Sequence, residues 1–266
     1  MSFTRVFAIF LRQAFLLRRS MGRLFGIFYW TTVELFLWGI LTVYLNRIGN
    51  AEVNFVTMLL GALIFWDFFL RIQHGVATSF LEDVWSRNFA NLFATPLEPG
   101  ELLAGLVLVG SVQAVLSLAF MSALAALLFA FDITRLGFAL LPFIGVLFIF
   151  GWAIGIAVNA IVLRFGSAAE VLAWSIPFLF QPLAAVFYPV SALPGWLQTV
   201  SRGIPATHVF EGMRAVLAGG PLAVSSLLNG LGLAVVYLAA GAMLFLAAFR
   251  AAKKHGYLVH FSTEGF

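Results

Sequence analysis

Residues 79–99 read SFLEDVWSRNFANLFATPLEP and form a charged stretch between long apolar runs. Ser79 and Glu82 have the spacing of a capping box, in which each side chain satisfies a free amide at the start of a helix. Pro96 disfavours helical geometry at the residue before it and ends a helix there. The stretch therefore predicts a short helix that begins at Ser79, ends before Pro96 and lies outside the hydrocarbon of a membrane.

This predicted helix is amphipathic. Its apolar residues recur at three- and four-residue intervals and so share one face. Asp83 and Arg87 are four residues apart, a spacing that predicts an ion pair on another face. A short charged helix with one apolar face is typical of a surface helix pressed against a membrane or a partner protein. The apolar residues are Trp85, Phe89, Leu92 and Phe93.

The composition excludes a soluble domain. Of 266 residues, 62% are hydrophobic and 10% charged, and the mean hydropathy is +1.04. Charged residues make up about a quarter of a soluble protein, so lipid must cover much of this chain. The absence of cysteine excludes disulfides and thiolate metal sites. We expect no nucleic-acid partner, because the basic residues flank apolar runs and form no separate basic domain.

Residues 1–23 predict a helix that lies in the cytoplasmic interface of the membrane. Arg5, Arg12 and Arg19 are seven apart and stay close to one helical face, from which they would reach the headgroups. A secretory signal is excluded because Arg12 interrupts the apolar core. The alternative is a plain basic flank that only sets topology. The residues expected to face the acyl chains are Phe7, Phe10, Phe15 and Leu16.

Six apolar stretches are long enough to cross a bilayer, which takes about 20 residues. We therefore expect an all-α polytopic membrane protein with one domain over residues 1–266 and no internal repeat. The expected spans are residues 24–45, 53–70, 102–131, 136–163, 171–190 and 222–249.

The distribution of Lys and Arg predicts the orientation of these spans. With an inside amino terminus, the segments on the outer side hold four basic residues, namely Arg47, Arg135, Arg202 and Arg214. The inner segments hold eleven, namely Arg5, Arg12, Arg18, Arg19, Arg23, Arg71, Arg87, Arg164, Arg250, Lys253 and Lys254. The positive-inside rule then places both termini in the cytoplasm. We expect the protein in the bacterial inner membrane.

Residues 191–219 cannot form one helix, because prolines interrupt them. Proline is favoured at the start of a helix, so the stretch predicts two short helices, Pro194 to Arg202 and Pro205 to Leu217. Gly219 suits the exit from the second helix. We interpret these helices as re-entrant elements on the outer face, since broken backbone at membrane depth must be covered by protein or line a wet cavity.

Ionisable residues within spans indicate function by default, because they are costly there. Asp67 precedes Arg71 by one turn, which predicts a structural pair. Glu34 lies near the middle of the first span and has two interpretations. It pairs with another helix or a second copy of the chain, or it lines a polar path and carries protons.

Pro177, Pro182 and Pro189 predict a bent fifth span, whose freed carbonyls need protein, water or a ligand. A bent helix of this kind often borders a pathway, although ordinary packing is the alternative for each aromatic residue. The residues expected to touch a transported molecule are Phe178, Gln181, Phe187 and Tyr188, together with Glu34.

The sequence offers no catalytic chemistry. Its only lysines, Lys253 and Lys254, follow no glycine-rich loop, so a P-loop for ATP is absent. The histidines have no zinc-ligand spacing, and no Ser-His-acid arrangement stands out. We therefore expect no enzyme activity, no metal and no cofactor on this chain.

Two stretches resemble one known family. LEDVWSRNFANLFATPL (81–97) and QPLAAVFYPVSALPGWLQTVSRGIPATHVFEGMRAVL (181–217) are similar to the coupling helix and the outer re-entrant signature of ABC type-2 permeases, the membrane subunits of export-type ATP-binding cassette transporters. The similarity spans nearly the whole chain. The signature residues are Tyr188, Pro189, Leu193, Pro194, Pro205, His208, Glu211 and Arg214.

The resemblance implies a six-span domain that pairs with a second copy, most simply as a homodimer, with a substrate path at the interface. It also implies a separate nucleotide-binding ATPase subunit that holds ATP and Mg. Residues 164–170 would be a second, smaller contact with it. The cargo would be a lipid, a lipid-linked glycan or a hydrophobic small molecule moved outward. The residues that would meet the ATPase are Glu82, Asp83, Trp85, Arg87 and Asn88.

Two other classes of function remain open at this point. Glu34 and Asp67 could serve a proton-coupled secondary transporter. A membrane scaffold or a lipid-modifying enzyme is disfavoured, because no catalytic cluster is present.

Overall fold

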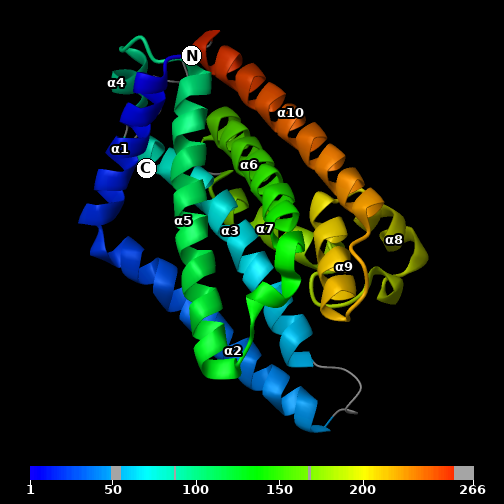
Figure 1. Ribbon diagram of the computed structural model, residues 1–266. Helices are drawn as coiled ribbons and strands as arrows, with labels where there is room; N and C mark the ends of the chain where they lie inside the picture. The colour runs from blue at the N-terminus through cyan, green and yellow to red at the C-terminus, as the bar shows by residue number, and fades with distance from the viewer. Residues whose placement is uncertain (49–54, 87, 167–168, 255–266) are drawn as a thin grey trace.

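The computed structural model describes residues 1–48, 55–86, 88–166 and 169–254. Within these ranges the regular elements are all helices (Figure 1). They are α1 (Phe3–Arg19), α2 (Met21–Ile48), α3 (Phe55–Trp85), α4 (Phe89–Phe93), α5 (Pro99–Phe129), η1 (Ile133–Ala139), α6 (Leu140–Phe165), α7 (Val171–Leu183), η3 (Val190–Ala192), α8 (Gly195–Arg202), α9 (Pro205–Leu217) and α10 (Val224–Lys254).

Five helical segments in the described part of the chain are long and apolar enough to cross a membrane. The expected all-α polytopic membrane protein is therefore confirmed. The five segments are Phe28–Ile48, Thr57–Trp85, Pro99–Phe129, Ile133–Phe165 and Val224–Lys254.

The prediction of one membrane-spanning helix over residues 171–190 is wrong, because the helix there is too short. This helix, α7, has 13 residues and rises about 20 Å, which is short of the roughly 30 Å of a hydrocarbon core. Two prolines lie inside α7, and beyond it Ala185 adopts a left-handed conformation with φ 50°. Apart from the short η3, the backbone between α7 and α8 is therefore irregular.

Helix α3 is the central element of the bundle. Inside the membrane-span segment of α3, 83% of the residues are buried, against 22% for the corresponding windows of α2 and α10. Glycines allow its neighbours to approach closely. A Cβ on Gly75 would lie 2.5 Å from the Cα of Gly110 in α5, and a Cβ on Gly155 of α6 would lie 2.8 Å from the Cβ of Val76. Movement of α3 must therefore involve α5 and α6.

The predicted helix start at Ser79 is wrong, because α3 runs without a break from Phe55 to Trp85. Ser79 is buried inside α3, less than two turns before the end of the helix, where a helix already under way leaves no free amide for a cap. The predicted helix over residues 79–95 is instead the end of α3 followed by the short α4. The capping box lies at the start of α5, between Glu98 and Glu101.

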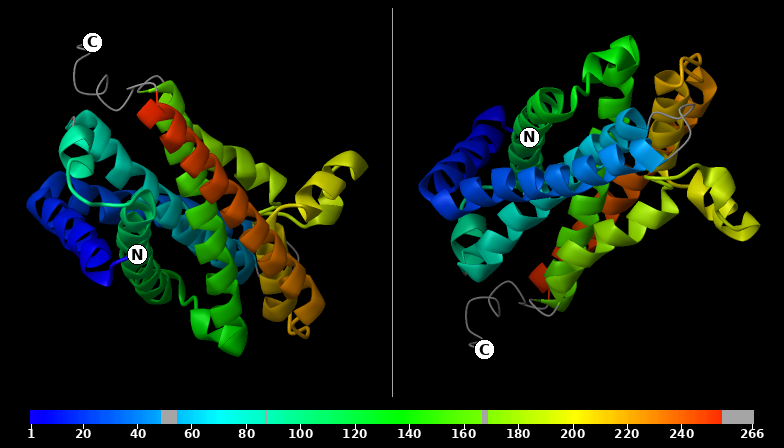
Figure 2. Two further views of the ribbon diagram at one scale, coloured as in Figure 1. Left: turned by 90° about the horizontal axis from the view of Figure 1, so that it is seen from above. Right: turned by 90° about the horizontal axis from the view of Figure 1, so that it is seen from below.

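The two short helices before α10 are confirmed within one residue of their predicted bounds. Pro194 is the N-cap of α8, and Pro205 occupies the first turn of α9. Gly219 follows α9 with φ +80°, a left-handed conformation that glycine adopts without strain. Figure 2 shows α8 projecting from the side of the bundle in the views from above and below.

The two ends of the bundle hold different elements. Figure 1 places α1, α4, the start of α5 and the end of α10 at one end, and α9 with the start of α3 toward the other. The first of these ends carries most of the basic residues counted as inner. Arg71 is an exception, because α3 continues past it and its half-buried side chain pairs with Asp67 inside the bundle. When Arg71 is left out, the inner segments still hold more basic residues than the outer segments.

Candidate functional site

The charged end of the bundle is held together by α1. Arg12 of α1 forms an ion pair with Asp83 of α3, and Asp83 is 1% exposed. Ser79 lies one turn before Asp83 on α3, and its carbonyl accepts from Nε2 of Gln13 at 3.1 Å. These contacts fix α1 against the last turns of α3.

A second anchor joins α1 to the start of α5 through Glu101. Its Oε1 accepts from the backbone amide of Ser2 at 2.6 Å, and its Oε2 lies 3.3 Å from Nη1 of Arg5. The same carboxylate also accepts from the amide of Glu98, 3.0 Å away, as part of the capping box. One buried carboxylate thus caps α5 and holds the beginning of α1.

The prediction that the arginines of α1 reach out to headgroups is wrong for Arg5 and Arg12. Both point toward the bundle, because buried carboxylates on α3 and α5 offer stronger partners than water. Of the four residues predicted to face the acyl chains, Phe7, Phe15 and Leu16 are exposed and Phe10 is half-buried.

The end of α3 is also linked to the start of α7. The indole Nε1 of Trp85 donates to Oε2 of Glu170 at 2.9 Å, while the Trp85 side chain stays half exposed. Asn88 is half-buried and donates from its backbone to the carbonyl of Asp83 at 3.0 Å. Arg87 lies outside the described residues, so its predicted pair with Asp83 is not described. The ion-pair partner that the structure gives to Asp83 is Arg12.

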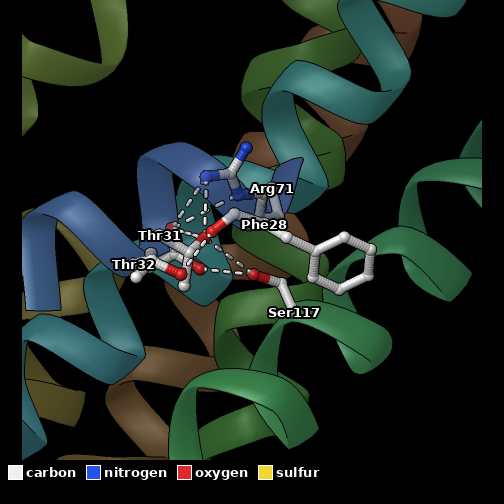
Figure 3. A network of polar contacts seen from close by, with 6 residues as sticks. Phe28, Thr31, Thr32, Arg71 and Ser117 are labelled. Atoms are coloured by element: carbon white, nitrogen blue, oxygen red, sulfur yellow. Dashed lines mark hydrogen bonds and ion pairs between the residues drawn. The ribbon is translucent and has the colours of Figure 1, made fainter. Parts of the chain in front are cut away.

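A buried polar cluster joins α2, α3 and α5 deeper in the bundle (Figure 3). The predicted pair is present, with Oδ1 of Asp67 3.2 Å from Nη2 of Arg71. Thr31 of α2 donates to the same oxygen at 3.2 Å, and Ser117 of α5 donates to Oδ2 at 2.7 Å. Nη2 of Arg71 donates to Oγ1 of Thr31 at 2.9 Å. Asp67 is therefore a hydrogen-bonded hub between three helices.

Sequence reasoning found Asp67 and Arg71 in this cluster and missed Thr31 and Ser117. Hydroxyl residues are common in membrane helices, so a hydroxyl within an apolar span was only a weak signal for these two. Glu34 lies one turn after Thr31, is half-buried and interacts electrostatically with Asp67 and Arg71. Glu34 thus borders the cluster.

At the other end, the signature residues hold the irregular backbone between α7 and α9. Arg214 is 6% exposed and donates from Nη1 to the carbonyl of Val186 at 3.0 Å and from Nη2 to Oε1 of Glu211 at 2.8 Å. The same Glu211 oxygen accepts from the amide of Val190 at 2.7 Å. The ring of His208 bonds Ser226 at 2.9 Å and the Arg202 carbonyl at 3.0 Å. Each bond anchors a backbone segment or the start of α10.

The residues predicted to line a substrate path do not gather at one place in the described structure. Phe187 stacks on Trp38 with ring centroids 4.5 Å apart, and the hydroxyl of Tyr188 donates to the carbonyl of Pro182 at 2.8 Å. Phe178 is exposed on α7, and Gln181 is half-buried. Neither of two cavities, of about 320 and 330 Å³, is lined by these side chains.

These features define a polytopic helical membrane protein whose long central helix ends in a charged, multiply anchored region and whose opposite end contains a proline-broken pair of short helices. The family model of the ABC-2 type transporter matches residues 5–218, so the chain belongs to the ABC-2 type transporter family. It is a permease component of an ATP-binding cassette transporter, as the resemblance implied. Among curated proteins, none matches the chain.

Proposed function

We propose that this chain is the permease subunit of an exporter, with ATP and Mg held by a separate ATPase subunit. It would move a lipid, a lipid-linked glycan or a hydrophobic small molecule outward across the bacterial inner membrane, working as a homodimer. The observation that carries this proposal is the charged end of α3, which is anchored to α1 and to the start of α7 and continues into the segment around α4.

Helix α3 suits the transmission of a mechanical step. It has 31 residues in one unbroken helix, about 45 Å long, and it packs on α5, α6 and α9. A push at Trp85 would therefore reach the Asp67 cluster and the far end of the bundle without an intervening hinge. The long helix thus connects an ATPase contact to the parts of the protein that border the transport path.

The predicted coupling residues divide into two roles in this proposal. Trp85 is exposed enough to contact an ATPase directly, and Asn88 and Arg87 follow it in the chain. Asp83 is buried, so it acts as a positioning residue that holds the end of α3 to α1 through Arg12. Glu82 directly precedes Asp83 and is half-buried.

The test is ATP hydrolysis and transport by the assembled complex in lipid nanodiscs, with Arg12→Ala, Asp83→Ala and the charge-swapped pair Arg12→Asp with Asp83→Arg. Residues that share one ion pair couple by about 0.5–3 kcal/mol, so each single variant should lower transport per ATP hydrolysed and the swapped pair should recover part of it. Arg18→Ala is the matched control, because Arg18 is an exposed arginine of the same helix.

Full coupling in Asp83→Ala would refute the positioning role of this residue. The same experiment separates the proposal from proton-coupled transport through Glu34 and Asp67. Transport that needs a proton gradient but no ATPase subunit would favour that second class and exclude ours.

A further inference from the structure

Five phenylalanines form a closed circle of ring contacts where α3, α4 and α10 meet at the charged end of the bundle (Figure 1). Neighbouring ring centroids lie 4.7 to 6.3 Å apart, within the range of about 4.5–7 Å that aromatic pairs prefer. Phe93 is half-buried and the other four are buried. This phenylalanine cluster consists, in order around the circle, of Phe80 in α3, Phe89 and Phe93 in α4, and Phe249 and Phe245 in α10.

The cluster determines where α4 lies. Helix α4 has five residues, about one and a half turns, and a helix this short is not stable by itself in water. Its sequence, FANLF, contains no charged residue, so no ion pair of its own can hold it. The ring of Phe89 contacts α3, and the ring of Phe93 contacts α10. The part of the predicted apolar face that lies in α4 therefore packs against the bundle.

Helix α10 extends the connection from the cluster through the rest of the bundle. It has 31 residues in one helix, about 45 Å long. About two turns before Phe249, a Cβ on Gly241 would lie 2.8 Å from the carbonyl oxygen of Ala153, so the backbones of α10 and α6 are in close contact. Near the start of α10, the hydroxyl of Ser226 bonds the ring of His208 in α9. One helix thus joins the cluster to α6 and to α9.

The cluster resists movement of α4 relative to α10. Phe89 is 1% exposed and Phe245 is 0% exposed, so neither ring faces a space into which it can shift. Protein interiors are close-packed, and a void among buried rings costs free energy that rises with its volume. The ion pair between Arg12 and Asp83 differs in this respect, because its two charged groups can exchange each other for water. Displacement of α4 therefore moves α10 more readily than it separates the two helices.

We propose that the phenylalanine cluster is a second mechanical connection of the ATPase-contacting segment, which makes α4 and the end of α10 move as one body and passes the displacement along α10 to α6 and α9. Phe93 and Phe249 act as positioning residues, since their contact joins α4 directly to α10. This connection runs in parallel to α3, which receives the displacement at Trp85. The inference rests on the proposed function, because it requires an ATPase that pushes this end of the protein.

The test uses two fluorescent reporters at the opposite end of the bundle, one for each route. The sequence contains no cysteine, so one introduced cysteine can be labelled with bimane, whose fluorescence changes with its surroundings. Leu228→Cys reports on the start of α10, where Leu228 is exposed, and Met58→Cys reports on the start of α3, where Met58 is half-buried. Each labelled chain is assembled with its ATPase in lipid nanodiscs, and the fluorescence response to MgATP with vanadate is measured.

Phe93→Ala should lower the response of the α10 reporter about threefold or more, since the loss of one aromatic contact shifts an equilibrium by about that factor. The response of the α3 reporter should stay unchanged, because its route does not pass through α10. Phe93→Tyr should keep the α10 response, since tyrosine retains the ring and its hydroxyl can reach water from this half-buried position. Phe249→Ala should act like Phe93→Ala. Its matched control is Leu246→Ala, which shortens an exposed side chain of the same helix outside the cluster.

The double variant Phe93→Ala with Phe249→Ala shows whether the two rings act through one contact. Its α10 response should be no lower than that of the single variant with the larger loss, because residues that act through one contact are not additive. Additive losses would overturn the contact between Phe93 and Phe249 as the connection. A full α10 response in Phe93→Ala overturns the proposal, and so does an equal loss at both reporters, which is the result of a general weakening of the complex.

Failure of the proposed function gives a different result. If neither reporter responds to MgATP when the cluster is unaltered, the ATP-driven mechanism is wrong and this inference falls with it. A response of the α3 reporter alone, again with the cluster unaltered, leaves the proposed function intact and overturns only the connection through α10.

Discussion

The two ends of the molecule are stabilised in different ways. At the α1 end, ion pairs join residues far apart in sequence, such as Arg5 and Glu101, which are 96 positions apart. At the α9 end, Arg214 and Glu211 bond mainly to backbone atoms within 28 positions. Ion pairs between separate helices can open and re-form while each helix stays intact. Bonds to an irregular backbone fix the path of the chain itself.

This difference suits a transporter whose α1 end receives a mechanical step. The backbone after α7 leaves carbonyl and amide groups that no helix satisfies, and in an apolar environment such groups need side-chain partners. Arg214 and Glu211 supply them for Val186 and Val190. We therefore expect the α9 end to behave as a rigid unit and the α1 end to separate first under stress.

The largest effect expected from this contrast is that of Arg214→Ala. The substitution leaves the Val186 carbonyl without its donor and Glu211 without its cation, which should lower the free energy of unfolding by about 2–4 kcal/mol. Thermal unfolding in nanodiscs measures the loss. Arg202→Ala is the matched control, since the Arg202 side chain is exposed and the residue bonds His208 through its backbone carbonyl, which the substitution keeps. Equal stability of the two variants would remove the proposed stabilising role of Arg214.

A smaller and more local effect is expected from Glu101→Ala. The change removes the acceptor for Ser2 and for Glu98 as well as the partner of Arg5, so α1 should detach from α5 while the bundle remains folded. Amide hydrogen exchange should become faster in α1 and stay unchanged in α9. Glu101→Gln separates the two contributions, because the amide keeps an acceptor oxygen and loses the charge. Faster exchange throughout the protein after Glu101→Ala would contradict a local anchor.

Much of the fold could be predicted from sequence where one local signal dominates. Apolar length located the long helices, and the prolines at the starts of α8 and α9 set their first residues to within one position. The same local reasoning failed at Ser79, because a capping pattern has meaning only where a helix actually begins. It failed at residues 184–190 as well, since hydropathy does not reveal where a helix gives way to irregular backbone.

The candidate site was predictable only in part, because its contacts join helices that are distant in sequence. The spacing of Asp67 and Arg71 lies within one helix and was recognised correctly. The pairing of Asp83 with Arg12 rather than with a neighbour depends on how α1 docks, which no local pattern encodes. The cavity of about 330 Å³ assembles residues from five helices and had no sequence signal at all.

The smallest expected effect tests the polar cluster that lies between the two ends. Ser117→Ala removes the donor to Oδ2 of Asp67 and should lower the free energy of unfolding by about 1 kcal/mol, in the range of hydrogen bonds between membrane helices. Ser122→Ala is a close control, because Ser122 lies on the same helix and its buried hydroxyl has no partner among the described residues. Removing that hydroxyl should be neutral or slightly stabilising. Thermal unfolding of both variants gives the comparison, and an equal loss in the two would mean that the bond to Asp67 contributes no stability. A loss of stability confined to Ser117→Ala would show that the hydrogen bond from Ser117 to Asp67 stabilises the contact between α5 and α3. This contact differs from those at both ends, because it joins two separate helices without an ion pair between their described residues.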